Sequence, residues 1–113
     1  MIQQQTDIYI KACMKTWLIC ESCIHAEVTS TMPRVDLVRE CRECAQSCFG
    51  VVCKLISQRD DLGDLILNCL LHCRQCYEEC EKYAEEEYDI QYCGNVCVVC
   101  AETLKDIMVF QLN

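Results

Sequence analysis

Apolar side chains recur every three or four residues along four segments of the chain, and short polar stretches separate these segments. This spacing holds the side chains on one face of an α-helix, because a helix turns by about 100° per residue. Pro33 follows the polar stretch EVTST, where it can open the second helix. The predicted helices run from about Thr6 to Glu27, from Val35 to Ser57, from a cap at Asp60 or Asp61 to Lys82, and from Ile90 to Phe110.

The connections between these helices are short, and the chain has one Pro, three Gly and no low-complexity linker. Short connections favour neighbouring helices that run in opposite directions. A chain of 113 residues is also long enough to bury a hydrophobic core. We therefore predict an all-α fold, an antiparallel up-down-up-down four-helix bundle with a cysteine-lined core, formed by a single domain of residues 1–113.

Cysteines occupy the apolar positions of every predicted helix. In the stretch NCLLHCRQCYEEC, the four cysteines from Cys69 to Cys80 are separated by four, three and four residues, so their thiols share one helix face. Apolar residues continue each stripe at the same phase, which predicts that these cysteines face the core. Cys53 is the exception, because it lies five residues after Cys48 and therefore points outward or into an interface. The 13 cysteines at the core phase are Cys13, Cys20, Cys23, Cys41, Cys44, Cys48, Cys69, Cys73, Cys76, Cys80, Cys93, Cys97 and Cys100.

The antiparallel topology also predicts which end of the bundle each residue occupies. The first and third connections share one end, which we call the thiol end because Cys23, Cys41, Cys80 and Cys93 lie nearest to it. The termini and the second connection share the other end, here called the apolar end. The prediction is a thiol-lined tube that is open, or able to open, at the thiol end and closed by aliphatic packing at the apolar end. The residues predicted to close it are Thr6, Ile10, Leu55, Leu62, Leu65, Ile107 and Met108.

Composition and charge limit the compartment and the partners. The N-terminal stretch MIQQQTDIYIKACMK lacks the basic and apolar regions of an export signal, so we expect a cytoplasmic protein with reduced thiols. No apolar run approaches the roughly 20 residues that a membrane-spanning helix needs. A net charge of −8 argues against nucleic acid and anionic membrane surfaces as partners.

The number of cysteines favours metal binding over two simpler roles. Free cysteine can fill a core as a small apolar residue, but Leu and Ile fill space better and do not oxidise as readily. Disulfides are disfavoured by the reducing compartment and by the very small loops that neighbouring thiols would close. Soft thiolate ligands then leave Cu(I), zinc and iron-sulfur clusters as the metals to consider.

The helical spacing of the thiols suits Cu(I) best among these metals. Structural zinc normally uses an isolated quartet in two pairs, and bacterial ferredoxins wrap their clusters in a loop whose last Cys precedes Pro. Two thiols four residues apart on a helix can share one Cu(I) ion, and thiols three apart, such as Cys20 and Cys23, can extend the array. The pairs with the four-residue spacing are Cys44/Cys48, Cys69/Cys73, Cys76/Cys80 and Cys93/Cys97.

The segments CRECAQSC, CRQCYEECEKY and YCGNVCVVCAETL resemble the cysteine-rich four-helix-bundle copper storage proteins, and the similarity covers most of the chain. The resemblance implies a bundle that holds many Cu(I) ions, a homotetramer, and a cytosolic location for forms without an export signal. Relatives tend to carry several His or Met residues at the thiol end. Here the third connection offers Tyr83, Glu86, Tyr88 and Asp89 instead.

Two residues near the first connection are candidate ligands for incoming copper. His25 and Met32 carry soft or borderline donor atoms, but each can equally be an exposed connection residue, and this second interpretation is favoured for His25. His72 lies about 60° from its cysteine stripe and is interpreted as a flanking or surface residue. Met14 and Met108 are interpreted as filling residues of the core or an interface.

The sequence therefore predicts a non-enzymatic, cytosolic protein that stores or sequesters multiple Cu(I) ions, with copper donor or acceptor proteins as partners. An iron-sulfur electron carrier is the alternative, and a thiol-redox protein is a third class. We expect the metal-free bundle to keep its thiols protonated and to remain folded. We also expect a homo-oligomer, because several apolar residues fall away from the thiol stripes. These residues are Ile19, Leu71, Val98, Val109 and Phe110.

Overall fold

The computed structural model of the chain describes residues 3–57, 62–83 and 85–112. Within these ranges the helices are joined by turns and irregular segments and there is no strand, which confirms the all-α prediction. The helix bounds differ from the predicted ones by at most a few residues. The four helices are α1 (Gln3–Val28), α2 (Val35–Ile56), α3 (Gly63–Glu81) and α4 (Tyr88–Leu112).

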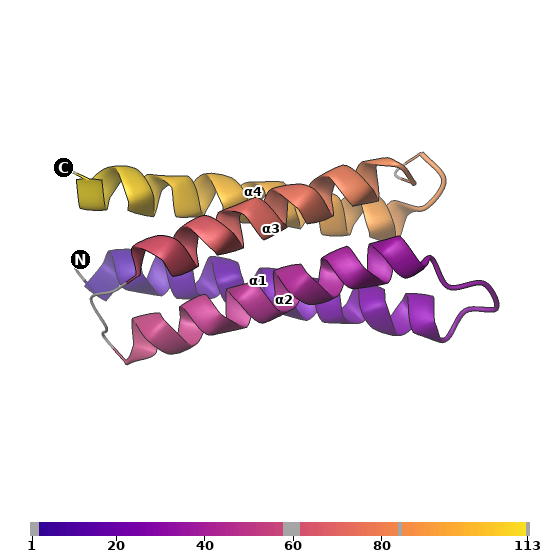
Figure 1. Cartoon of the computed structure of the whole chain (residues 1–113), viewed down its shortest axis with the longest axis horizontal. Helices are drawn as coiled ribbons and strands as arrows, with labels where there is room; N and C mark the ends of the chain where they lie inside the picture. Colours follow the sequence, from indigo (N-terminus) through magenta and orange to yellow (C-terminus); the bar gives the residue numbers. More distant parts are fainter. Residues whose placement is uncertain (1–2, 58–61, 84, 113) are drawn as a thin grey trace.

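The helices pack in a ring in which each one contacts the helices before and after it, and α4 closes the ring against α1. Successive helices run in alternate directions along a molecule of 46 × 22 × 21 Å (Figure 1). The α1–α2 and α3–α4 connections lie together at one end, while both termini and the α2–α3 connection lie at the other. The thiol end and the apolar end are therefore arranged as predicted.

α2 begins at Val35, as predicted, directly after Arg34, whose backbone is extended. The start of α3 departs from the predicted cap. Leu62 precedes α3 and is buried, and its side chain cannot accept a capping hydrogen bond. Asp60 and Asp61, which were predicted to cap this helix, lie outside the described residues.

Aliphatic side chains fill the apolar end, as the sequence predicted. Leu55, Leu62 and Ile107 are buried there. Three further predicted members, Thr6, Ile10 and Leu65, are only half-buried, and the side chain of Met108 lies outside the described residues. Additional side chains at the same helix phase complete the packing. These are Tyr9, Ile66 and Leu104.

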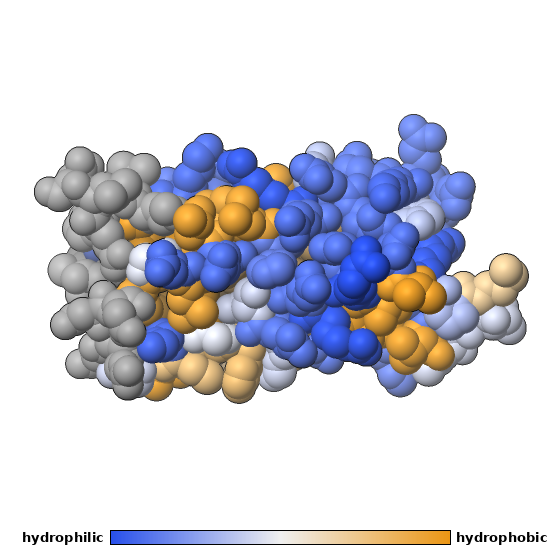
Figure 2. All heavy atoms as spheres, viewed as in Figure 1, coloured by the Kyte–Doolittle hydropathy of each residue, from blue (hydrophilic) through white to orange (hydrophobic). Residues whose placement is uncertain are grey.

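The outer surface is less apolar than predicted at two positions. Leu71 is 46% exposed, as expected, but Ile19 is half-buried because it packs against the core, and Val98 is half-buried as well. The side chains of Val109 and Phe110 lie outside the described residues. Figure 2 shows a mainly hydrophilic face that carries separate apolar patches. In the described part of the chain, no helix combines the length and apolar character required to span a membrane.

Candidate metal centre

The helix phase places nearly all the cysteines in the interior. Twelve of the 14 cysteines are buried, Cys23 is partly exposed, and Cys53 is exposed. This confirms the prediction that Cys53 points away from the other thiols. Because no cysteine of the chain is in a disulfide, the interior presents free thiols.

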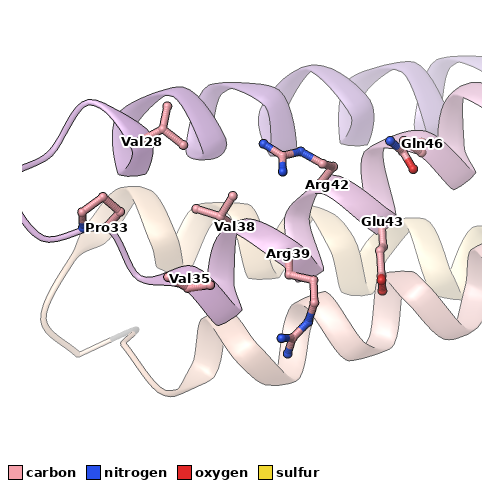
Figure 3. Close-up of a pocket in the computed structure, with 8 residues that line it drawn as sticks. All are labelled: Val28, Pro33, Val35, Val38, Arg39, Arg42, Glu43 and Gln46. Atoms are coloured by element: carbon pink, nitrogen blue, oxygen red, sulfur yellow. The ribbon is translucent and has the colours of Figure 1, made fainter.

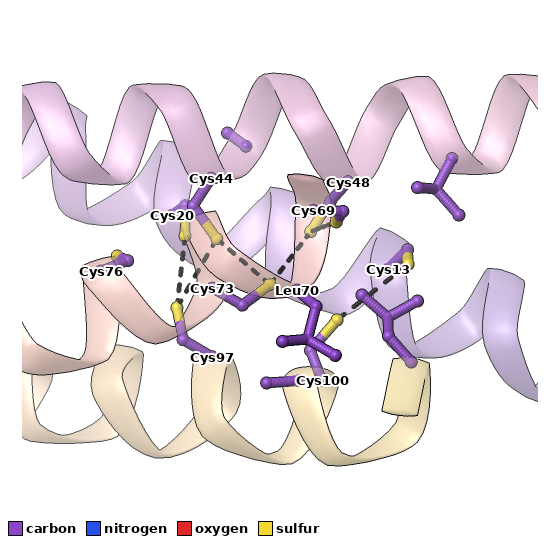
Figure 4. Packing of buried hydrophobic residues seen from close by; sticks show 14 of the residues in the cluster. Cys13, Cys20, Cys44, Cys48, Cys69, Leu70, Cys73, Cys76, Cys97 and Cys100 are labelled. Carbon is purple, nitrogen blue, oxygen red and sulfur yellow. Dashed lines mark hydrogen bonds between the residues drawn. The ribbon is translucent and has the colours of Figure 1, made fainter. Parts of the chain in front are cut away.

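The closest thiol contacts join different helices. Sulfur atoms from all four helices approach one another along the centre of the bundle, as the dashed lines in Figure 4 show for several of them. The sequence could predict pairs along one helix, but the facing thiols of the neighbouring helices are as close as 3.6 Å. The contacts are Cys44–Cys73 and Cys48–Cys69 at 3.6 Å, Cys20–Cys97 and Cys41–Cys76 at 3.7 Å, Cys44–Cys97 and Cys48–Cys73 at 3.9 Å, and Cys13–Cys100 and Cys20–Cys93 at 4.0 Å.

Among the described residues, four groups of thiols converge closely enough to hold a metal ion, with all sulfur atoms of a group within 4.8 Å of one another. The groups overlap, because four cysteines each belong to two of them. These are Cys20, Cys44, Cys48 and Cys76. The thiols therefore form a continuous array. From the thiol end inward, the groups are Cys20/Cys41/Cys76/Cys93, Cys20/Cys44/Cys76/Cys97, Cys44/Cys48/Cys73 and Cys13/Cys48/Cys100.

The remaining core cysteines join the same array. Cys69 contacts Cys48 at 3.6 Å. Cys23 and Cys80 lie at the outermost level, where hydrogen bonds with Cys41 and Cys93 affect the pKa of both thiols. All 13 cysteines that were predicted to face the core are thus in one interior array, and antiparallel packing gives the order of levels that was expected.

Burial and shared hydrogen bonds keep most of these thiols protonated. The pKa of Cys97 is raised well above its usual value of 9.0 by hydrogen bonds with neighbouring thiols, first that with Cys20, and by burial. The hydrogen bond with Cys41 lowers the pKa of Cys23, but the hydrogen bond with Cys93 and burial outweigh this and raise it to about 12. Hydrogen bonds with neighbouring thiols, first that with Cys20, lower the pKa of Cys93. Ionisation of one sulfur therefore opposes ionisation of its neighbours.

An ionic contact and apolar side chains cover the thiol end. Arg34 binds Glu27 of α1 and Glu87 beside the start of α4, and its guanidinium lies 4.8 Å from the centre of the Tyr83 ring. Tyr83 is half-buried and packs against the core, so the third connection is not only a solvated loop. Glu86 of the same connection is exposed, as are Tyr88 and Asp89, which form the start of α4. Three buried apolar residues at this end are Ile24, Leu37 and Ile90.

The candidate ligands outside the cysteine stripes are not brought into the array. His25 is exposed and belongs to none of the converging groups found in the described part of the chain, and Met32 is 85% exposed. His72 is half-buried between α2 and α3, where its Nδ1 atom lies 3.6 Å from a carboxylate oxygen of Glu43. Met14 is 40% exposed, so it is not a core residue of this chain.

Two residues of the interior were not singled out from the sequence. Thr16 is fully buried on the stripe of α1 between Cys13 and Cys20, and its hydroxyl donates to the Ala12 carbonyl at 2.8 Å. Its spacing from the two cysteines, three and four residues, was the available signal. Gly94 lies where a Cβ atom would come within 3.0 Å of the Cys80 Cβ, so this glycine permits close approach of α3 and α4. Sequence spacing carries no signal for such a contact.

A surface groove of about 620 Å³ lies outside the thiol array. Its lining residues come from the end of α1, the α1–α2 connection and α2, and they include no cysteine (Figure 3). Val28 and Pro33 border it on one side and Arg42 and Glu43 on the other. The groove is therefore separate from the candidate metal centre.

Comparison with known proteins gives one family. The family model described as copper storage protein (Csp) matches residues 2–108, a range that contains every cysteine of the chain. No curated protein and no solved structure shows a significant match.

Proposed function

Because the chain belongs to the copper storage protein family, we propose that it is a cytosolic, non-enzymatic store that holds many copper ions as Cu(I) within a single domain of residues 1–113. The proposed ligands are the 13 interior cysteines. Cys53 is not a ligand in this proposal, because it is exposed and lies outside the array. The overlap of the thiol groups is the observation that carries the proposal.

Overlapping ligand groups favour Cu(I) over the other thiophilic metals. A structural zinc site is closed, with four ligands reserved for one ion. Here Cys44 and Cys48 each belong to two groups, so neighbouring ions would share thiolates. Cu(I) suits such an array, because soft thiolates select it and the groups of three and four thiols share members, so none of them is an isolated quartet.

Charge balance sets the expected capacity. Each thiolate that binds copper loses a proton, and each Cu(I) ion adds one positive charge. A buried array is least unfavourable when these charges nearly cancel, which requires about one ion per thiolate, or about 13 ions per chain. We propose that ions enter at the thiol end, because aliphatic side chains such as Leu104 and Ile107 fill the other end.

An anaerobic titration tests the proposed function. Reduced, metal-free protein is titrated with Cu(I) against a chromophoric chelator, and bound metal is measured on the isolated complex. Saturation near the number of interior cysteines, without colour or an electron paramagnetic resonance signal, is the expected result. Saturation at one or two Cu(I) ions would contradict storage. Iron with visible charge-transfer bands and a paramagnetic signal on reduction would instead establish the iron-sulfur electron carrier.

We also propose that the protein is a homo-oligomer, with a tetramer as the assembly that family resemblance implies. The exposed apolar side chains of Leu18, Phe49 and Val99 support this proposal, because association would remove them from water. Sedimentation velocity over a wide concentration range is the test. A single monomeric species throughout that range would exclude the proposal.

A further inference from the structure

A single arginine ties the helix ends together at the thiol end. Arg34 stands immediately before α2, and its Nη1 donates to Glu27 Oε2 at 2.8 Å near the end of α1. Its Nη2 donates to Glu87 Oε1 at 2.6 Å next to the start of α4. Its guanidinium also lies over the ring of Tyr83, which follows α3. We call these four residues, Glu27, Arg34, Tyr83 and Glu87, the Arg34 latch.

The latch is fixed most firmly at Glu27. The side chain of Glu27 is only 6% exposed, and both of its oxygens accept hydrogen bonds from Arg34, one from the guanidinium and one from the backbone N–H. A buried carboxylate without these partners would be strongly unfavourable. The Glu87 contact is more exposed, with 45% of that side chain accessible, so it can open at a smaller cost.

The latch stands directly outside the first thiols that an ion would meet. Glu27 follows Cys23 by four residues on α1, so both lie on the same helix face. Cys23 is the one cysteine of the array that is partly exposed. An ion that approaches it from the side of Glu27 meets the positive guanidinium of Arg34, which repels cations, and the Tyr83 ring, which provides no soft ligand.

Opening the latch would reverse the local charge. When the guanidinium swings away from the core, the carboxylates of Glu27 and Glu87 lose their cationic partner and together attract a cation. The same movement removes the cover that Arg34 and Tyr83 form between α3 and the first connection. Release of an ion from the interior requires the reverse passage through the same opening.

We propose that the Arg34 latch controls the rate at which copper enters and leaves the thiol array. The proposal rests on the proposed copper storage function and adds to it the residues that regulate exchange. The latch does not bind stored copper, so it affects the rates of loading and release and leaves the capacity unchanged.

Three variants and a matched control test the latch. Arg34→Gln removes the guanidinium, Glu87→Gln weakens only its exposed contact, and Tyr83→Leu removes the ring beneath it. Arg39→Gln is the control, because Arg39 is also on α2 but contacts Asp36 and Glu40 on an exposed face. Loading from a Cu(I)–chelator complex and removal by excess chelator are followed anaerobically by the absorbance of the chelator complex.

We expect Arg34→Gln to load and to release copper about tenfold faster than the unchanged protein, the factor that loss of a charge-assisted hydrogen bond from the closed state gives. Glu87→Gln and Tyr83→Leu remove an exposed ion pair and a ring contact, so they should accelerate exchange by a smaller factor, about twofold to fivefold. Capacity should be the same, and Arg39→Gln should exchange copper at the unchanged rate. If Arg34→Gln fails to fold because Glu27 is left unpaired, Glu87→Gln and Tyr83→Leu decide the question.

Unchanged exchange rates in the folded latch variants would overturn the latch. So would an equal acceleration by Arg39→Gln, because the effect would then be one of surface charge. These outcomes differ from failure of the storage function itself. In that case the unchanged protein would already saturate at one or two copper ions.

Discussion

The two halves of the bundle share the same helices and the same helical phase, but their cores are filled differently. On α4, Cys97 and Leu104 are one heptad apart and both are completely buried. On α2, Leu55 likewise follows Cys48 by seven residues. A leucine removes more apolar surface from water than a cysteine does, so the apolar half contributes more stability per residue. The comparison teaches that stability and metal-ligand chemistry are separated along one axis of the molecule.

Truncation of a core residue in the apolar half should have the largest effect on stability. Leu104→Ala would leave a cavity at a site with no exposed surface, which costs about 2–5 kcal/mol. Urea unfolding of the reduced, metal-free protein, followed by circular dichroism, measures this change. Copper capacity should not change, because no thiol is lost. A marked fall in the capacity of the folded variant would show that the two halves are not independent.

Truncation of a core cysteine in the thiol half should lower the copper capacity and have only a small effect on stability. Cys48→Ala removes a smaller side chain, so we expect a loss of about 1 kcal/mol in the metal-free protein. Capacity should fall by about one ion, because charge balance assigns about one Cu(I) ion to each thiolate. Metal analysis of the loaded variant measures the loss, and Cys53→Ala is the matched control outside the array. Equal capacities in the two variants would contradict the assignment of ligands.

Alkaline pH should weaken the metal-free protein through its thiol half. The pKa of Cys20 and that of Cys23 are each raised from 9.0 to about 12, so the unfolded chain releases these protons at a lower pH than the folded bundle does. Stability should therefore decrease as the pH rises from about 9 towards 12. Thermal unfolding at a series of pH values measures this decrease. Copper-loaded protein has already lost these protons, and an identical alkaline loss in it would argue against thiolate ligation.

The smallest effect is expected from a methyl group at the closest approach of α3 and α4. Gly94→Ala would place a Cβ atom 3.0 Å from the Cys80 Cβ, whereas the same change at Gly50 meets only the Leu65 side chain at 3.7 Å. Gly50→Ala should stabilise the helix by up to about 1 kcal/mol through helix propensity. At Gly94 we expect the clash to cancel or reverse this gain, by about 1 kcal/mol. Thermal unfolding of both variants makes the comparison, and equal stabilisation would show that the helices separate freely there.

Much of the fold could be predicted from sequence because it depends on local periodicity. The phase of the cysteines was sufficient to place 13 of them inside and Cys53 outside. The contacts between helices could not be predicted, because the distance from Cys48 to Cys69 depends on how α2 and α3 rotate and slide against each other. The latch was missed for a similar reason. Arg34 reads as an ordinary surface residue until the fold brings Glu87, 53 residues away in sequence, beside it.

The sharing of thiol groups along α2 has a consequence for how such a container can be enlarged. Cys44 and Cys48 are four residues apart on one stiff helix, so the groups that they link repeat about every 6 Å along the axis. The number of binding positions should then increase in proportion to the length of the helices, without any change in the cross-section of the bundle. Insertion of one heptad with two in-phase cysteines into each helix would lengthen the container by about 10 Å and add about eight thiols. A lengthened protein of this kind would be a modular design in which capacity is set by the number of inserted repeats.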